Sequence, residues 1–144
     1  MPRFLAYRTN ILVMTQKITL QMSADHRFSI ADGRNIEALN PKEMLLYASL
    51  ECLAHTITSL LKERIKVLKT LELTLEGTLS TPTVMAESTY THFDVTYNAE
   101  CHDLKEQEVV SRAINLANDK YCGMLQMLRK IAPLTHTTSI VATN

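Results

Sequence analysis

Hydrophobic and polar residues alternate along several stretches of the chain, and segments with helical spacing lie between them. Alternation at every second position is typical of a strand with one buried face. The stretch 11–23 has this pattern, and after a polar break a shorter stretch follows at 27–31, so we predict a hairpin. The stretches 67–79 and 89–101 alternate over a longer distance and are predicted to be adjacent antiparallel strands.

A long helix is predicted between these two pairs of strands, at residues 40–65. Asn40 is a good N-cap, Pro41 falls at the first helical position, and Glu43 lies where it can complete a capping box. The helix is apolar on most of its circumference, so it must be covered on several sides. Its apolar residues are Met44, Leu45, Leu46, Leu50, Leu53, Ile57, Leu60 and Leu61.

The pattern becomes helical again after residue 103. Asp103 and Glu106 can form a second capping box, the polar segment 118–124 interrupts the helix, and a last strand is predicted at 135–143. Strands mixed with helices, without regular β-α-β alternation, indicate an α+β fold. We predict a single domain, 1–144, made of N-terminal strands at 1–39, the long helix at 40–65, strands at 66–102, and a broken helix pair with the last strand at 103–144.

Composition narrows the classes of partner. Lysine plus arginine and aspartate plus glutamate number 15 each, so the formal net charge is zero, and a nucleic-acid partner is not expected. We identify no uninterrupted apolar run of about 18 residues, so no membrane association is expected. The N-terminal residues do not have the pattern of a signal peptide, and we predict a cytoplasmic protein.

The chain has three cysteines, which argues against a disulfide scaffold. Without paired C-x-x-C or H-x-x-x-H spacing, or a glycine-rich phosphate loop, no metal and no cofactor are expected. Cys101 continues an apolar strand face and is predicted to be a packing residue. Cys52 is open to either interpretation, packing or chemistry. Cys122 precedes Gly123 at a predicted helix start, where the pKa of a thiol is lowered, and Lys120 would help.

Three motifs in the same order carry a resemblance to a known family. They are N-P-x-E-x-L-x-x-A-x-x-x-C at residues 40–52, K-Y-C at 120–122 and L-T-H-T-x-x-I at 134–140. Over roughly residues 30–141 the chain resembles the OsmC/Ohr family, the osmotically induced and organic hydroperoxide resistance proteins, and most of all its YhfA-like branch. The resemblance implies an OsmC-like fold with antiparallel sheets packed around two main helices, and an intertwined homodimer with the long helix at its centre.

The resemblance also implies a thiol-dependent peroxidase that reduces organic hydroperoxides. Cys52 would be the nucleophile and Cys122 the resolving thiol, and an external thiol or dithiol would regenerate the pair without a metal or flavin. In the peroxidase members an arginine from the preceding loop and a glutamate early in the helix support the thiolate. We assign these roles to Arg34 and Glu43.

The sequence departs from the family pattern near the start of the long helix. Lys42 occupies the position of the usual glutamate, and Glu43 lies one residue later, about 100° round the helix. The capping box is therefore the favoured role of Glu43. Arg27 is an alternative to Arg34, and Lys42 is itself an alternative source of positive charge.

Two other functions are weighed against peroxidase activity. One is a non-catalytic OsmC-fold dimer that binds a small apolar or thiol ligand, or acts as a redox sensor. The other is a Cys–His hydrolase, because His55 follows Cys52 by three residues, although a hydrogen-bonded core histidine is the favoured interpretation. His136 is assigned a structural role.

Overall fold

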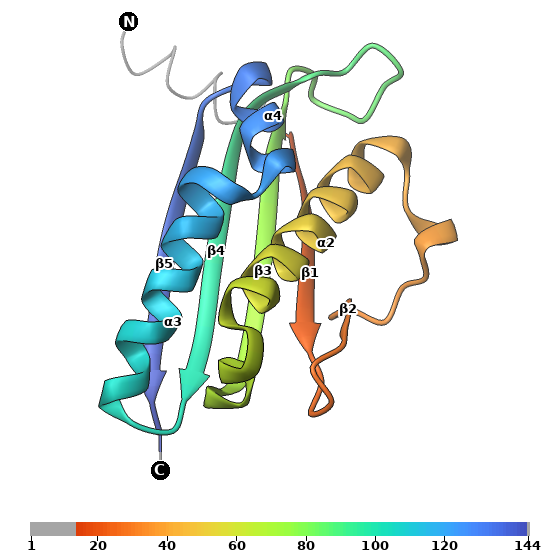
Figure 1. Cartoon of the computed structure of the whole chain (residues 1–144). Coiled ribbons are helices and arrows are strands. Elements are labelled where there is room, and N and C mark those ends of the chain that lie inside the picture. Colours follow the sequence, from red (N-terminus) through yellow and green to blue (C-terminus); the bar gives the residue numbers. More distant parts are fainter. Residues whose placement is uncertain (1–13, 144) are drawn as a thin grey trace, which may run out of the picture.

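The computed structural model describes residues 14–143 and contains one five-stranded sheet with its helices on one face (Figure 1). The strand order is β2-β1-β3-β4-β5. The α+β prediction is confirmed, and residues 11–13 of the predicted first strand lie outside the described residues. The strands are β1 (Met14–Met22), β2 (Phe28–Ile30), β3 (Leu68–Leu79), β4 (Tyr90–Cys101) and β5 (Leu134–Ala142).

The last strand corrects the expectation of purely antiparallel sheets. β1 pairs antiparallel with β2 and β3, and β3 pairs antiparallel with β4, as predicted. β5, however, runs parallel to β4. The chain between β4 and β5 contains two helices. It can therefore return to the end of the sheet where β4 begins, and β5 then runs beside β4 in the same direction.

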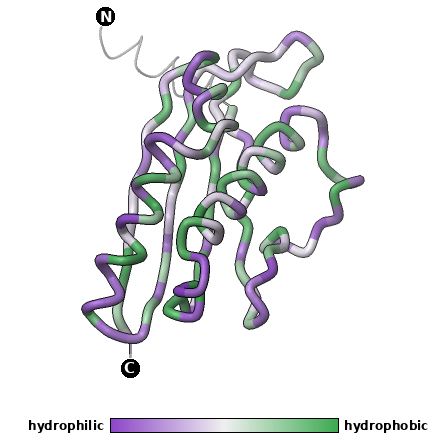
Figure 2. The backbone as a smooth tube through the Cα atoms, in the orientation of Figure 1, coloured by the Kyte–Doolittle hydropathy of each residue, from purple (hydrophilic) through white to green (hydrophobic). Residues whose placement is uncertain are grey.

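The period-2 pattern of the strands separates an apolar face from a polar one. Leu71, Leu73 and Leu75 of β3 are buried under the helices, whereas Glu72 and Thr74 alternate with them on the open face. Figure 2 shows hydrophobic and hydrophilic residues alternating along the strands. The core therefore lies between this apolar face and the helices.

The long helix α2 (Pro41–Leu61) begins as predicted and ends earlier. The Asn40 side chain accepts a hydrogen bond from the Glu43 N–H (2.8 Å), and Glu43 Oε1 accepts one from the Asn40 N–H (3.0 Å), which confirms the capping box. Lys62 has a φ of 53°, and Lys62–Val67 form a 3₁₀ segment, η2, in place of the predicted last turn. A residue with positive φ cannot continue a right-handed helix, so α2 stops there.

The apolar circumference of α2 is covered only in part within the chain. β1, β3, α3 (Leu104–Leu116) and α4 (Gly123–Ile131) contact it, and Met44 is left 42% exposed. Pro41–Val67 is also the one segment among residues 14–143 that is long and apolar enough to cross a membrane, which corrects the expectation from composition. Because much of its apolar surface packs on its own sheet, we interpret it as the core helix of a soluble fold.

The predicted interruption of the C-terminal helix is a π-helical turn. Asp103 and Glu106 form the predicted capping box at the start of α3. Residues Ala117–Tyr121 form the π-helix η3, and α4 then begins after Cys122. Such wide turns inside helices are frequent at functional sites.

Tyr90 fixes the start of α2 against the sheet. Its ring lies over Gly77 of β3, where a Cβ atom would come within 2.3 Å of the ring. Its hydroxyl donates a hydrogen bond to the Lys42 carbonyl oxygen (2.6 Å). A larger residue at position 77 would displace the ring and with it the anchor of α2.

Candidate functional site

Two of the three thiols meet between helices α2 and α4. Cys52 lies in the middle of α2 and Cys122 is the N-cap of α4, and the Cys122 S–H donates to Cys52 Sγ across 3.6 Å. Cys122 is fully buried, whereas Cys52 is partly exposed. A molecule from solvent therefore reaches Cys52 first. A gap of 3.6 Å is wider than a disulfide bond of about 2.05 Å, so both thiols are free in this structure.

Burial dominates the acidity of Cys122 and corrects the prediction of a lowered pKa. The pKa of the Cys122 thiol is raised to about 11, chiefly by burial and in smaller part by the hydrogen bond to Cys52, while the backbone N–H groups of Leu125 and Met124 act in the opposite direction. The N–H groups at the start of α4 do lower the thiol pKa, as expected, but this lowering is smaller than the rise caused by burying a thiolate. The ammonium of Lys120 lies over the Tyr121 ring at 5.2 Å instead of at the thiol.

This raised pKa predicts a loss of stability in alkaline solution. The folded state keeps the Cys122 proton up to about pH 11, whereas an unfolded thiol releases it near pH 9. The contribution to stability is complete below about pH 9 and is lost as the pH rises to about 11, and it amounts to roughly 1–3 kcal/mol. Urea unfolding of the reduced protein should show a steeper decline over this range than that of Cys122→Ala. Equal declines in the two proteins would contradict the prediction.

A buried polar network lies beside Cys122, in the π-helical turn. The Tyr97 hydroxyl donates to Asn118 Oδ1 (2.7 Å), and the Asn118 amide donates to Asp119 Oδ1 (3.0 Å) and lies 3.4 Å from His136 Nδ1. Burial raises the pKa of Tyr97, and the charge of a Cys122 thiolate would add to that rise. The contacts of His136 agree with its predicted structural role. Sequence reasoning missed Tyr97 and Asn118, because a tyrosine on a strand face and an asparagine in a helix break have no distinctive pattern.

Arg34 and Glu43 form a second pair, separate from the thiols. Arg34 Nη1 binds Glu43 Oε2 (2.8 Å) and Arg34 Nε binds Asp32 Oδ2 (2.8 Å). The alternative, Arg27, pairs instead with exposed Asp25. Glu43 thus combines the capping box with the arginine contact. It precedes Cys52 by nine residues, roughly 13.5 Å along the axis and half a turn round the helix.

Lys42 and His55 are directed to other partners. The Lys42 ammonium donates to the Ala86 carbonyl oxygen (3.3 Å), so its charge lies in the loop between β3 and β4. The side chain of His55 is 81% exposed and lies 3.6 Å from Glu51 Oε2. The prediction of a core histidine is therefore wrong. Among the described residues no hydrogen bond joins His55 to Cys52, and the Cys–His hydrolase has no geometric support.

The remaining cysteine has the environment of a packing residue, as predicted. Cys101 is fully buried, its S–H donates to the Asp103 carbonyl oxygen at 3.4 Å, and burial raises its pKa. Residues 14–143 contain no group of three or more His, Cys, Asp or Glu side chains that could hold a metal ion.

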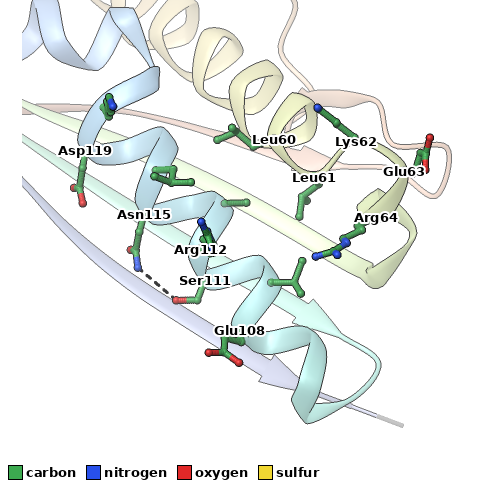
Figure 3. A pocket seen from close by; sticks show the side chains of 14 residues that line it. Leu60, Leu61, Lys62, Glu63, Arg64, Glu108, Ser111, Arg112, Asn115 and Asp119 are labelled. Carbon is green, nitrogen blue, oxygen red and sulfur yellow. Dashed lines mark hydrogen bonds between the residues drawn. The ribbon is translucent and has the colours of Figure 1, made fainter.

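A groove of about 1050 Å³ lies away from the thiols, between the end of α2, η2 and α3 (Figure 3). Its walls include Leu60, Leu61 and Leu116, with Arg64 and Arg112 on opposite sides. Neither Cys52 nor Cys122 lines it. Acidic side chains, Glu63, Glu108 and Asp119, also line it, so an apolar surface lies among charges of both signs, which is suited to an amphipathic molecule.

The α+β fold and the comparison with known families together define the class of protein. The chain belongs to the OsmC-like protein family, whose family model matches residues 32–137. Protein YhfA of Escherichia coli K12 is 30% identical over 124 residues, which cover 85% of this chain and 88% of that protein.

Solved structures agree with this assignment at the level of the fold. A chain from structural genomics is 28% identical and has a TM-score of 0.59, with 90% of this chain and 99% of that chain covered. An OsmC-like protein from Mycoplasma pneumoniae is 12% identical and has a TM-score of 0.55. The match covers 90% of this chain and 95% of that protein.

Proposed function

We propose that this protein is a thiol-dependent peroxidase that reduces organic hydroperoxides through Cys52 and Cys122. The observation that carries the proposal is the 3.6 Å distance between the two sulfur atoms, which belong to residues 70 positions apart. Membership of the OsmC-like family supports it. The difference in exposure supports these roles, because the nucleophile must meet the substrate and the resolving thiol need only meet the nucleophile.

The reaction has three balanced steps. The Cys52 thiolate attacks the terminal oxygen of the hydroperoxide, the O–O bond breaks, and the alkoxide takes a proton to leave as the alcohol. The Cys122 sulfur then attacks the Cys52 sulfenic acid, the S–O bond breaks, and the hydroxyl leaves as water with the Cys122 proton. An external dithiol, or two thiols, finally reduces the disulfide and is itself oxidised.

The Cys122 S–H would assist the first two steps. It points at Cys52 Sγ, where a donated hydrogen bond stabilises the thiolate that attacks the substrate. The same proton is placed to leave with the hydroxyl of the sulfenic acid. Burial keeps this proton on Cys122 at neutral pH, since it raises the pKa to about 11.

Arg34 and Glu43 would act as positioning residues within one subunit. Their ion pair and the capping box hold the first turn of α2, the helix that carries Cys52. We also propose that the protein is a cytoplasmic homodimer. Exposed apolar side chains on the helices, Met44 of α2 and Met127 and Ile131 of α4, support a second copy packing there.

The substrate class is tested by the rate of sulfenic acid formation on Cys52. Leu45 and Ala48 precede Cys52 by seven and four residues, on the same side of α2, and both are at least partly exposed. A hydrocarbon substituent would contact them. Cumene hydroperoxide should therefore react with Cys52 faster than hydrogen peroxide does. The rate is measured by trapping the sulfenic acid with dimedone in samples quenched at successive times. A hydrogen peroxide rate equal to or above that of cumene hydroperoxide would contradict an organic substrate.

The groove beside Arg64 and Arg112 favours a second candidate, a non-catalytic protein that binds a small apolar or thiol ligand. In that case both thiols would react with hydroperoxides no faster than a free cysteine. Ligand binding would then respond to substitution of Leu60 in the groove and not to Cys52→Ser. These two measurements separate the candidates.

A further inference from the structure

Three polar side chains share one face of α4. Gln126 follows Cys122 by four residues and Arg129 follows Gln126 by three, so all three project within about 60° of one another. The Gln126 backbone N–H donates to the carbonyl oxygen of the N-cap residue Cys122 (3.2 Å), which is the first hydrogen bond of α4. The resolving thiol therefore begins a polar stripe on a helix whose adjacent face, with Leu125 and Leu128, is fully apolar.

Two nitrogen atoms on this stripe are buried without an acceptor. Gln126 Nε2 and Arg129 Nη1 are both inaccessible and have no hydrogen-bond partner in the described part of the chain. None of the ion pairs found among residues 14–143 includes Arg129. Buried donors are nearly always paired, and an unpaired cationic donor is the most costly kind. Each nitrogen lacks an acceptor among the described residues, and an acceptor with negative charge would also offset the charge of Arg129.

Tyr97 links this stripe to the reaction centre. Arg129 is close enough to lower the pKa of Tyr97, and a Cys122 thiolate is close enough to raise it. The guanidinium and the thiol therefore border the same buried tyrosine. The spacing along α4 agrees with this, because it places Arg129 and Gln126 on the side of the helix that carries Cys122.

We propose that Arg129 and Gln126 form a carboxylate-binding subsite next to the Cys52–Cys122 pair. The inference rests on the proposed peroxidase function and names a chemical group carried by one of its reactants. A carboxylate has two coplanar oxygens, which match the N–H fork of a guanidinium and the N–H of an amide. A water molecule could accept the hydrogen bonds but would leave the charge of Arg129 uncompensated.

Entry of this ligand requires the two side chains to move. Gln126 and Arg129 are each partly exposed as residues, although the two nitrogens are buried. Rotation about the terminal torsion of a planar amide has a broad energy well. Such a rotation would turn the Gln126 donor from the interior toward solvent. The carboxylate belongs either to the hydroperoxide or to the reducing thiol, and both would use the same contacts.

Direct binding tests the subsite without any turnover. The probe is 4-isopropylbenzoate, added to the full chain carrying Cys52→Ser, with affinity measured by calorimetry. Arg129→Gln should weaken binding at least about tenfold, and the matched control Lys130→Gln, at an exposed neighbouring position, should not. No binding, or equal affinity in the two variants, would overturn the proposal. If Arg129→Gln does not fold, the affinity of Gln126→Met for the probe is measured instead. This substitution keeps the side-chain volume and removes the donor, so it should also weaken binding.

Matched reactants then identify the source of the carboxylate. For the reductant, 3-mercaptopropionate is compared with 2-mercaptoethanol in reducing the Cys52–Cys122 disulfide. For the substrate, a hydroperoxy fatty acid is compared with its methyl ester in forming the sulfenic acid. In one of these two comparisons the compound with the carboxylate should react faster. Arg129→Gln should abolish this preference, and Lys130→Gln should retain it. The absence of a preference in both comparisons would overturn the proposal. Probe binding in a protein that consumes no hydroperoxide would support the subsite while contradicting the peroxidase.

Discussion

Cys52→Ser should reduce hydroperoxide consumption to the rate of the buffer and reductant alone. The serine hydroxyl keeps the shape of the side chain, but it is neither acidic enough nor nucleophilic enough to attack a peroxide oxygen. Cys52 is the partly exposed member of the pair, so no other thiol is placed to replace it. Consumption is followed by the loss of cumene hydroperoxide in the presence of dithiothreitol.

Cys101→Ala is the matched control for this substitution. Cys101 is buried at the end of β4, and its S–H contacts are with backbone carbonyl oxygens, so its loss should affect stability and leave the peroxidase rate nearly unchanged. If the Cys52→Ser protein consumes hydroperoxide as fast as the unmodified protein, Cys52 is not the nucleophile.

Cys122→Ala should separate the first turnover from all later ones. Cys52 would still be oxidised to the sulfenic acid, at a somewhat lower rate, because the variant lacks the S–H that donates to Cys52 Sγ. The sulfenic acid would then persist, since no second thiol is within reach to form the disulfide. Repeated turnover should stop, and excess hydroperoxide should carry Cys52 to the sulfinic acid.

Mass spectrometry of the intact protein measures this outcome. After one equivalent of cumene hydroperoxide, Cys122→Ala should gain one oxygen atom, whereas the unmodified protein should lose two hydrogen atoms. Continued turnover by Cys122→Ala at the full rate would show that an external thiol attacks the sulfenic acid directly, and Cys122 would then have no resolving role.

Much of the fold follows from local patterns in the sequence. The alternation in β3 and β4 predicts their pairing, and Asn40 with Glu43 predicts the start of α2, because both signals act over a few residues. The direction of β5 is not local: it depends on how far α3 and α4 carry the chain back along the sheet. The early end of α2 at Lys62 likewise follows from the tertiary path into β3.

The site is less accessible to sequence reasoning. Cys52 and Cys122 are 70 residues apart, with no spacing that predicts contact, and their meeting is decided by how α4 packs on α2. The raised pKa of Cys122 has the same origin, because burial is a property of the packed core and outweighs the local helix start. The exposure of His55 shows that a residue three positions from a cysteine on a helix need not face it.

The most direct test of the two-thiol account is to map the disulfide after a single oxidation. The reduced protein is treated with one equivalent of cumene hydroperoxide, alkylated, digested and analysed by mass spectrometry. We expect one cross-link between the peptides that contain Cys52 and Cys122, with Cys101 alkylated as a free thiol. A protein with all three thiols still free, or a disulfide that includes Cys101, would contradict it.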